Sequence, residues 1–177
     1  DMPLEEAHDV LIREMHEQVH ETEVVTRNQL QDFEELIDQL KQKKNILAAT
    51  PSIKPVDGWI TSKFGYRSSP FTGQKEFHSG LDIANRHGKK VLATANGKVS
   101  YAGRKMLLGN LVVIDHGHGR ITRYGHLDKV LVKRGQTVKR GEPVGLLGNT
   151  GRSTGPHVHY EVKINGTPVN PVKYILN

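Results

Sequence analysis

The first quarter of the chain has apolar residues at helical spacing. A three-four spacing, interrupted at Lys44, links Leu30, Phe33, Ile37, Leu40 and Leu47, and a looser stripe links Leu4, Leu11, Met15 and Val19. Residues 4–47 contain no glycine or proline and are rich in Glu, Gln, Leu and Lys, a composition typical of helices. We therefore predict that residues 1–47 form a helical segment.

The two apolar stripes do not join into one. Poor helix formers stand between them at Thr22, Val24, Val25 and Thr26. Thr26 followed by Gln29 has the spacing of a capping box, which predicts that a helix starts there. We expect two helices or one broken helix, arranged as a helical hairpin or a short coiled coil. The imperfect heptads leave two alternatives open, since residues 4–47 fit either an amphipathic helix packed on its own chain or a segment that binds a helical partner.

Downstream of this segment the pattern changes twice. Residues 48–57 contain Pro51 and Pro55 in a polar stretch, which predicts a linker. From residue 58 to residue 177 glycine is frequent and apolar residues alternate in short runs. The runs expected to form strands are residues 90–93, 98–101, 111–115, 120–124, 130–132, 144–147 and 157–164. With turn signals at Asn96-Gly97 and Asn165-Gly166, the pattern predicts a mainly β domain, an antiparallel sheet or barrel-sandwich that needs no helix.

The two halves carry opposite charge. Residues 1–47 hold 12 acidic and five basic residues, net −7, and the remainder is +13. The basic part suits an anionic polymer such as nucleic acid, anionic lipid or acidic cell-wall glycopeptide. We do not expect nucleic acid to be the partner, because few aromatic residues are interleaved with the basic ones as stacking platforms.

The absence of cysteine from the chain limits the possible chemistry. It excludes disulfides, thiolate zinc sites and a thiol nucleophile, so a metal must be held by His, Asp or Glu, and ten histidines are present. The chain has no apolar run of 18 residues and begins at Asp1 without the pattern of a signal peptide. We expect an export signal, or a membrane anchor, upstream of this chain.

Two short segments place metal-binding side chains on one face of a strand. In an extended chain His78, Gly80 and Asp82 point the same way, and so do His157 and His159. Two histidines and one carboxylate supply three ligands for tetrahedral Zn²⁺ and leave the fourth position open, as in catalytic zinc sites. A further histidine, His126, is available for proton transfer.

The other histidines fit ordinary surface or turn positions. His116 and His118 form a second H-x-H, but flanking glycines between two predicted strands indicate a hairpin turn. His16 and His20 are four residues apart on the predicted acidic helix, where a solvated helix face is the simpler interpretation.

Three sequence motifs, taken in order, resemble the lysostaphin-like (LytM-domain) zinc metalloendopeptidases of bacterial peptidoglycan. The motifs are His-Ser-Gly-Leu-Asp at 78–82, Tyr-Gly-His-Leu at 124–127 and Thr-Gly-Pro-His-Val-His-Tyr-Glu at 154–161. The similarity runs from about Gly58 to Tyr174 and excludes the helical segment. It implies that the zinc ligands are His78, Asp82 and His159, and that the two catalytic histidines are His126 and His157.

The resemblance also implies a substrate and a location. The expected activity is zinc-dependent hydrolysis of peptide bonds in peptidoglycan cross-links or stem peptides, with D-Ala to diaminopimelate cross-links favoured over pentaglycine bridges, in the bacterial cell envelope, periplasmic or extracellular. The sequence leaves open which of His126 and His157 is the general base. The competing class is a non-catalytic envelope protein that activates an amidase or binds glycan, but an adaptor does not need a complete ligand set. A final hypothesis is that residues 1–47 limit access to the zinc groove.

Overall fold

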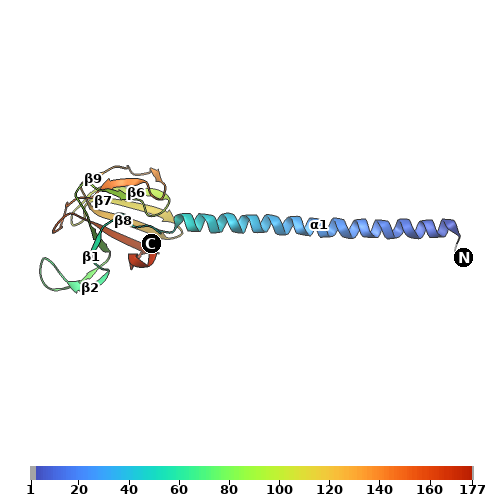
Figure 1. Cartoon of the computed structure of the whole chain (residues 1–177), viewed down its shortest axis with the longest axis horizontal. Coiled ribbons are helices and arrows are strands. Elements are labelled where there is room, and N and C mark those ends of the chain that lie inside the picture. Colours follow the sequence, from blue (N-terminus) through green and yellow to red (C-terminus); the bar gives the residue numbers. More distant parts are fainter. Residues whose placement is uncertain (1–2, 177) are drawn as a thin grey trace. The chain divides into compact units, whose positions relative to one another are not determined.

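The structure is a computed structural model that describes residues 3–176 (Figure 1). The chain divides into two compact units between Asn45 and Ile46. The first is helical and the second is mainly β, as the sequence predicts. Within residues 3–176, no helix is both long enough and apolar enough to span a membrane.

The helical segment is a single continuous helix, α1 (Leu4–Ala49), so the prediction of a hairpin or a broken helix is wrong. The hydroxyl of Thr22 donates to the carbonyl of Gln18 at 2.7 Å, and that of Thr26 to the carbonyl of Thr22 at the same distance. Both hydroxyls are therefore satisfied inside the helix, four residues back, and Thr26 does not cap a new one. The apolar stripe stays exposed in the single chain, with Phe33 63% exposed. A coiled coil remains a prediction.

The segment assigned above to a linker packs within the second unit. Ala49 and Val56 are only 6% and 2% exposed. The amide of Ser52 donates to the carbonyl of Thr94 at 3.1 Å, and the Arg140 guanidinium donates to the Leu47 carbonyl at 2.6 Å. Residues 46–57, including the last turn of α1, are thus held by the β domain through burial and hydrogen bonds.

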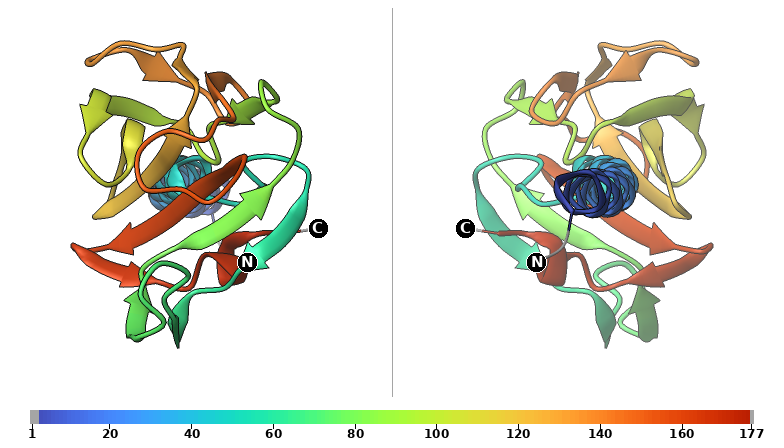
Figure 2. Two further views of the ribbon diagram at one scale, coloured as in Figure 1. Left: turned by 90° about the vertical axis from the view of Figure 1, so that its left-hand side faces the viewer. Right: turned by 90° about the vertical axis from the view of Figure 1, so that its right-hand side faces the viewer.

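Three antiparallel sheets make up the second unit. The strands are β1 (Trp59–Ser62), β2 (Gly65–Ser68), β3 (Lys75–His78), β4 (Leu81–Ala84), β5 (Lys90–Leu92), β6 (Gly97–Lys105), β7 (Gly109–Gly117), β8 (Arg120–Leu127), β9 (Lys129–Val130), β10 (Thr137–Val138), β11 (Pro143–Leu146), β12 (His157–Ile164) and β13 (Thr167–Val169). The largest sheet has the order β1-β4-β12-β8-β7-β6-β10, with β13 added to β12; the smaller ones are β5-β11-β9 and β2-β3. Figure 2 shows β12 beside β4 in the largest sheet.

The core lies on one face of the largest sheet, against the β5-β11-β9 sheet. Tyr160 of β12 and Tyr124 of β8 are fully buried there, with ring centroids 5.5 Å apart. Val91 of β5 and Val144 of β11 belong to the same buried cluster. Because side chains alternate along a strand, the neighbours of these tyrosines face the opposite side of the sheet.

The two predicted turns have different outcomes. Asn165 and Gly166, with φ of 48° and 81°, connect β12 to β13 in a tight hairpin, as predicted. Asn96-Gly97 does not make a hairpin, because β5 pairs with β11 whereas β6 pairs with β7 and β10. A short 3₁₀ helix, η1 (Pro171–Tyr174), was not expected from the sequence; the Asn170 side chain caps it by accepting from the amide of Val172.

Candidate metal centre

Three buried side chains converge on the face of the sheet opposite the core. Oδ1 of Asp82 lies 2.8 Å from Nδ1 of His159 and 3.2 Å from Nε2 of His78. These two nitrogens, Nδ1 of His159 and Nε2 of His78, lie 3.1 Å apart. Each residue is at most 7% exposed. The three ligand atoms could therefore hold one metal ion, and this is the group that the sequence predicts.

Strand pairing explains why residues so far apart in sequence meet. β12 runs antiparallel to β4 with His159 directly opposite Asp82. His78 ends β3, which pairs with β2 in a separate small sheet, so His78 and Asp82 do not share one strand. The turn at Ser79 and Gly80 nevertheless turns the His78 ring back onto Asp82.

Gly80 is required by close packing. A Cβ atom at this position would lie 2.7 Å from Cε1 of His159 and 2.7 Å from the carbonyl oxygen of Tyr160. The backbone oxygen cannot move away without disturbing β12. The lack of a side chain at Gly80 thus makes room for the His159 ring.

Backbone and side-chain partners orient the proposed ligands from behind. Nδ1 of His78 lies 2.9 Å from the carbonyl oxygen of Lys63, which only accepts, so Nδ1 carries the proton and Nε2 faces the group. The Arg67 guanidinium donates to the other oxygen of Asp82, Oδ2, at 3.2 Å and to Glu76 at 3.1 Å. Sequence reasoning did not single out Arg67, although it lies within the resemblance.

His126 reaches the site through an irregularity in the backbone. Tyr124 lies two residues earlier in β8 and faces the core, so a regular strand would aim His126 into the core as well. The pairing of β7 and β8 is bulged here: Gly125 and His126 stand opposite the single residue Leu111. His126 has φ of 60°, in the left-handed region. The bulge and this dihedral angle turn the His126 ring to the face of the sheet opposite the core, where the proposed ligands lie (the metal-centre face).

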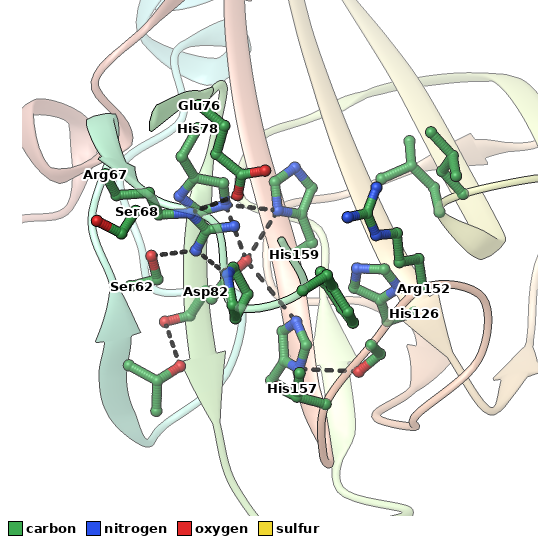
Figure 3. A pocket seen from close by; sticks show the side chains of 17 residues that line it. Ser62, Arg67, Ser68, Glu76, His78, Asp82, His126, Arg152, His157 and His159 are labelled. Carbon is green, nitrogen blue, oxygen red and sulfur yellow. Dashed lines mark hydrogen bonds and ion pairs between the residues drawn. The ribbon is translucent and has the colours of Figure 1, made fainter. Parts of the chain in front are cut away.

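His126 and His157 lie side by side next to the proposed ligands. Their ring centroids are 4.8 Å apart, and Nε2 of His157 is 3.8 Å from Oδ1 of Asp82. Nδ1 of His126 lies 2.7 Å from the carbonyl oxygen of Thr150, and Nδ1 of His157 lies 2.8 Å from that of Gly155. Both Nδ1 atoms therefore donate to the backbone, which leaves both Nε2 atoms for chemistry. Figure 3 shows the five site residues pointing toward one another around Asp82.

Burial and hydrogen bonds shift the pKa values of these groups in different directions. Burial lowers the pKa of His126 to about 4, so its ring is neutral at pH 7. Burial opposes ionisation of Asp82, but hydrogen bonds from His159 and His78 hold the pKa of that carboxyl well below its usual range. Burial also opposes protonation of His159, yet hydrogen bonds to Asp82 and Glu161 raise its pKa to about 9. Asp82 is thus a permanent anion at the centre of the site.

Glu161 is a second functional candidate that sequence reasoning missed. It follows His157 and His159 at the same period of two, and that alternation was the signal that could have found it. The carboxyl group is buried, but hydrogen bonds from His159 and Ser79 lower its pKa to about 2. It therefore remains charged.

The five site residues lie at the floor of an open groove (Figure 3). Its walls include Phe71 from the segment between β2 and β3, Leu107 from the β6–β7 connection, and Arg152. The Arg152 guanidinium stacks on the Phe71 ring at 4.3 Å from the centroid. The groove therefore exposes a cation and apolar surface next to the metal centre.

The second H-x-H is separate from this site. His116, His118 and the glycines around them lie at the β7–β8 hairpin, where Gly117, His118 and Gly119 all have positive φ. His116 is buried and lies 2.7 Å from both the Asn96 carbonyl oxygen and the Thr122 hydroxyl. His16 and His20 lie on the exposed surface of α1.

Together the fold and the site define an antiparallel β domain built around a buried His-Asp-His metal-binding group. Residues 76–171, more than half of the chain, match the model of Peptidase family M23. The chain therefore belongs to this family, and the resemblance noted from the sequence is confirmed.

Characterised proteins and solved structures agree with this membership. The chain is 48% identical over 122 residues to the peptidoglycan DD-endopeptidase ShyA of Vibrio cholerae, covering 67% of this chain and 28% of the relative. A zinc-containing peptidase from Vibrio cholerae superposes with a TM-score of 0.64 at 45% identity, covering 68% of this chain and 39% of that one. The catalytic domain of lysostaphin from Staphylococcus simulans gives a TM-score of 0.61 at 29% identity, covering 66% and 91%. The chain spans about a quarter of the length of the curated relatives it matches.

Proposed function

We propose that the chain is a zinc-dependent endopeptidase that hydrolyses peptide bonds in peptidoglycan cross-links, D-Ala to diaminopimelate bonds in particular, in the bacterial cell envelope. The observation that carries the proposal is the convergence of His78, Asp82 and His159 with two further histidines at the floor of one groove. The substrate class is supported by the similarity to a peptidoglycan DD-endopeptidase.

The donor set fits zinc. Two imidazole nitrogens and one carboxylate oxygen are ligands that Zn²⁺ takes, and three protein ligands leave a position open. His78 would bind through Nε2, because its Nδ1 donates to the Lys63 carbonyl. A bound zinc ion would supply a Lewis acid for the scissile carbonyl and would acidify a water molecule at the open position.

His126 and His157 are proposed to move protons. Each ring is fixed by an Nδ1–H bond to a backbone carbonyl, so each presents Nε2 to the groove. One of the two would accept a proton from the attacking water, and the other would donate to the developing oxyanion or to the leaving amine. At pH 7 the neutral ring of His126 presents a lone pair at Nε2, which suits a proton acceptor; as a donor it would first have to be protonated.

The groove would bind the substrate through charge and shape. Arg152 places a guanidinium beside the site, where it can pair with a carboxylate of the stem peptide. Phe71 holds that guanidinium by stacking and offers apolar surface to the peptide backbone. Bonds flanked by little side-chain bulk would fit such a groove.

Purified muropeptide dimers provide the direct test. The full chain should convert dimers to monomers, a chelator should abolish the conversion, and added zinc should restore it. Alanine at His78, Asp82 or His159 should remove both zinc and activity, whereas His87→Ala, an exposed histidine outside the site, should retain both. Full zinc content in all three ligand variants would refute the assignment of the site.

A further inference from the structure

Glu161 is a buried carboxylate that the proposed chemistry leaves unused. It is 3% exposed and lies on the metal-centre face of β12, two residues beyond His159. Burying an ionised carboxylate is costly unless its oxygens are paired. The partners of those oxygens should therefore reveal why the charge is there.

Three groups from different elements satisfy Glu161. The Ser79 hydroxyl donates to Oε1 at 2.6 Å, and the Arg123 guanidinium donates to Oε2 at 2.9 Å from the directly opposite position in β8. The third partner is His159, whose Nε2 lies 3.2 Å from Oε1. The carboxylate is thus held firmly, with one oxygen aimed at the back of a proposed metal ligand.

This contact decides which nitrogen of His159 is free. A carboxylate only accepts, so the facing Nε2 must carry a proton. Nδ1 also faces a carboxylate, at 2.8 Å from Oδ1 of Asp82, and it lies 3.1 Å from Nε2 of His78 within the group that could hold a metal. A metal held by this group would take the lone pair of Nδ1 in place of its proton, and Nε2 would keep the proton that Glu161 accepts.

The two proposed histidine ligands differ in this respect. His78 is backed by a neutral backbone carbonyl at Lys63 and binds through Nε2, whereas His159 is backed by a charged carboxylate and binds through Nδ1. A carboxylate behind a metal-bound imidazole fixes the ring orientation and makes the imidazole a more basic ligand. His159 is thus the ligand whose strength depends on a side chain.

We propose that Glu161 is a positioning residue that holds His159 in the Nδ1-binding tautomer and orientation, with Arg123 and Ser79 holding Glu161. This role rests on the metal site of the proposed function. It assigns a role to Glu161, which has none in that proposal. A purely structural alternative exists, in which Glu161 is present only to neutralise Arg123 across the sheet.

Zinc affinity separates the two roles. Dissociation constants of the full chain are measured by competition with a chromophoric chelator, with circular dichroism to check folding. Glu161→Gln should weaken zinc binding about 10- to 100-fold, the range seen when such partners of ligands are lost. Glu142→Gln makes the same charge change in a loop outside the site and should leave the affinity unchanged.

A second variant tests the ion-pair alternative. Arg123→Gln removes the pair but leaves the carboxylate next to His159, so its loss of zinc affinity should be much smaller than that of Glu161→Gln. Equal losses in the two variants, or unchanged affinity in Glu161→Gln, would overturn the positioning role. Failure of the unmodified chain to bind zinc would instead overturn the metal site itself, and the role with it.

A measurement on the unmodified chain keeps the test independent of variant folding. In the zinc-loaded protein, two-bond ¹H–¹⁵N correlations distinguish protonated from metal-bound ring nitrogens. His159 should be metal-bound at Nδ1 and protonated at Nε2, while His78 should show the reverse. Coordination of His159 through Nε2 would overturn the proposal whatever the variants do.

Discussion

His126 and His157 face each other across the groove floor with ring centroids 4.8 Å apart, and both direct Nδ1 to a backbone carbonyl. Neither Nδ1 is available to a metal or a substrate. The pair is therefore arranged for proton transfer through two Nε2 atoms, next to ligands that are arranged to bind a metal.

His126→Ala and His157→Ala should each keep zinc but lose turnover. A missing acid or base typically costs about 10²- to 10⁴-fold in rate, so kcat on muropeptide dimers should fall by this factor. Zinc content, measured by mass spectrometry, should equal that of the unmodified chain. A variant that loses its metal, or that keeps normal turnover, would contradict the role proposed for that residue.

Gly80→Ala should disrupt the metal centre by a steric effect. The added methyl group would lie 2.7 Å from both the His159 ring and the Tyr160 carbonyl oxygen. We expect a stability loss of about 1–3 kcal/mol and weaker zinc binding. Gly103→Ala is the matched control, because the nearest atom to its Cβ is 3.4 Å away. Thermal unfolding and zinc titration measure both effects, and normal zinc affinity in Gly80→Ala would show that the site adapts.

Arg152→Ala should act on substrate binding more than on chemistry. Loss of a charged hydrogen bond to a substrate carboxylate at this partly solvated groove should raise KM about tenfold, equivalent to ~1.4 kcal/mol, with a smaller change in kcat. Arg152→Lys should recover part of the loss. Arg134→Ala, an exposed arginine outside the groove, should leave both constants unchanged. An effect confined to kcat would place Arg152 in the chemical step instead.

His116 should make folding stability depend on pH. Burial lowers the pKa of His116 below its usual value, so the unfolded chain binds this proton more readily than the folded one. The stabilisation is complete above pH 6.5 and decreases as the pH falls below it, at up to ~1.4 kcal/mol per pH unit for one proton. Urea unfolding at pH 7.5 and 5.5 should show a smaller pH difference for His116→Gln than for the unmodified chain. Equal differences would show that His116 is protonated equally well in both states.

A chain that begins at Ile46 should fold without the rest of α1. It retains Ala49 and Val56, which are buried, and the amide of Ser52 that bonds to Thr94. It should keep zinc and cleave muropeptide dimers at least as fast as the full chain. A chain that begins at Gly58 loses these contacts and should be less stable in thermal unfolding. Slower cleavage by the Ile46 chain would show that the helix supports activity.

Much of the β domain could be predicted, because alternation in a strand depends only on local sequence. The period of two in β12 puts His157 and His159 on one face, and Asn165-Gly166 provides the hairpin turn. The hairpin predicted at Asn96-Gly97 is wrong, because a local turn signal does not determine which strand the chain pairs with next. The predicted break in α1 is absent, because the hydroxyls of Thr22 and Thr26 donate to backbone carbonyls four residues earlier in the same helix.

The candidate site was predictable where residue types are distinctive. The contribution of Arg67 could not be predicted from the sequence. Its contact with Asp82 depends on how β2 lies against β4, and no local sequence pattern encodes that arrangement. Glu161 was present in the alternation, but a lone glutamate in a strand has no meaning until Ser79 and Arg123 are seen around it.

The bulge at His126 has a consequence for comparing related sequences. An alignment column records which residue occupies position 126, but not the dihedral angle that aims it. A relative with all five site residues and regular pairing between β7 and β8 would point this histidine into the core, on the same side of β8 as Tyr124. Such a protein would bind metal and still be a poor catalyst. Inactive homologues can therefore arise from a one-residue insertion in β7 beside Leu111 that removes the bulge, with every recognised residue intact.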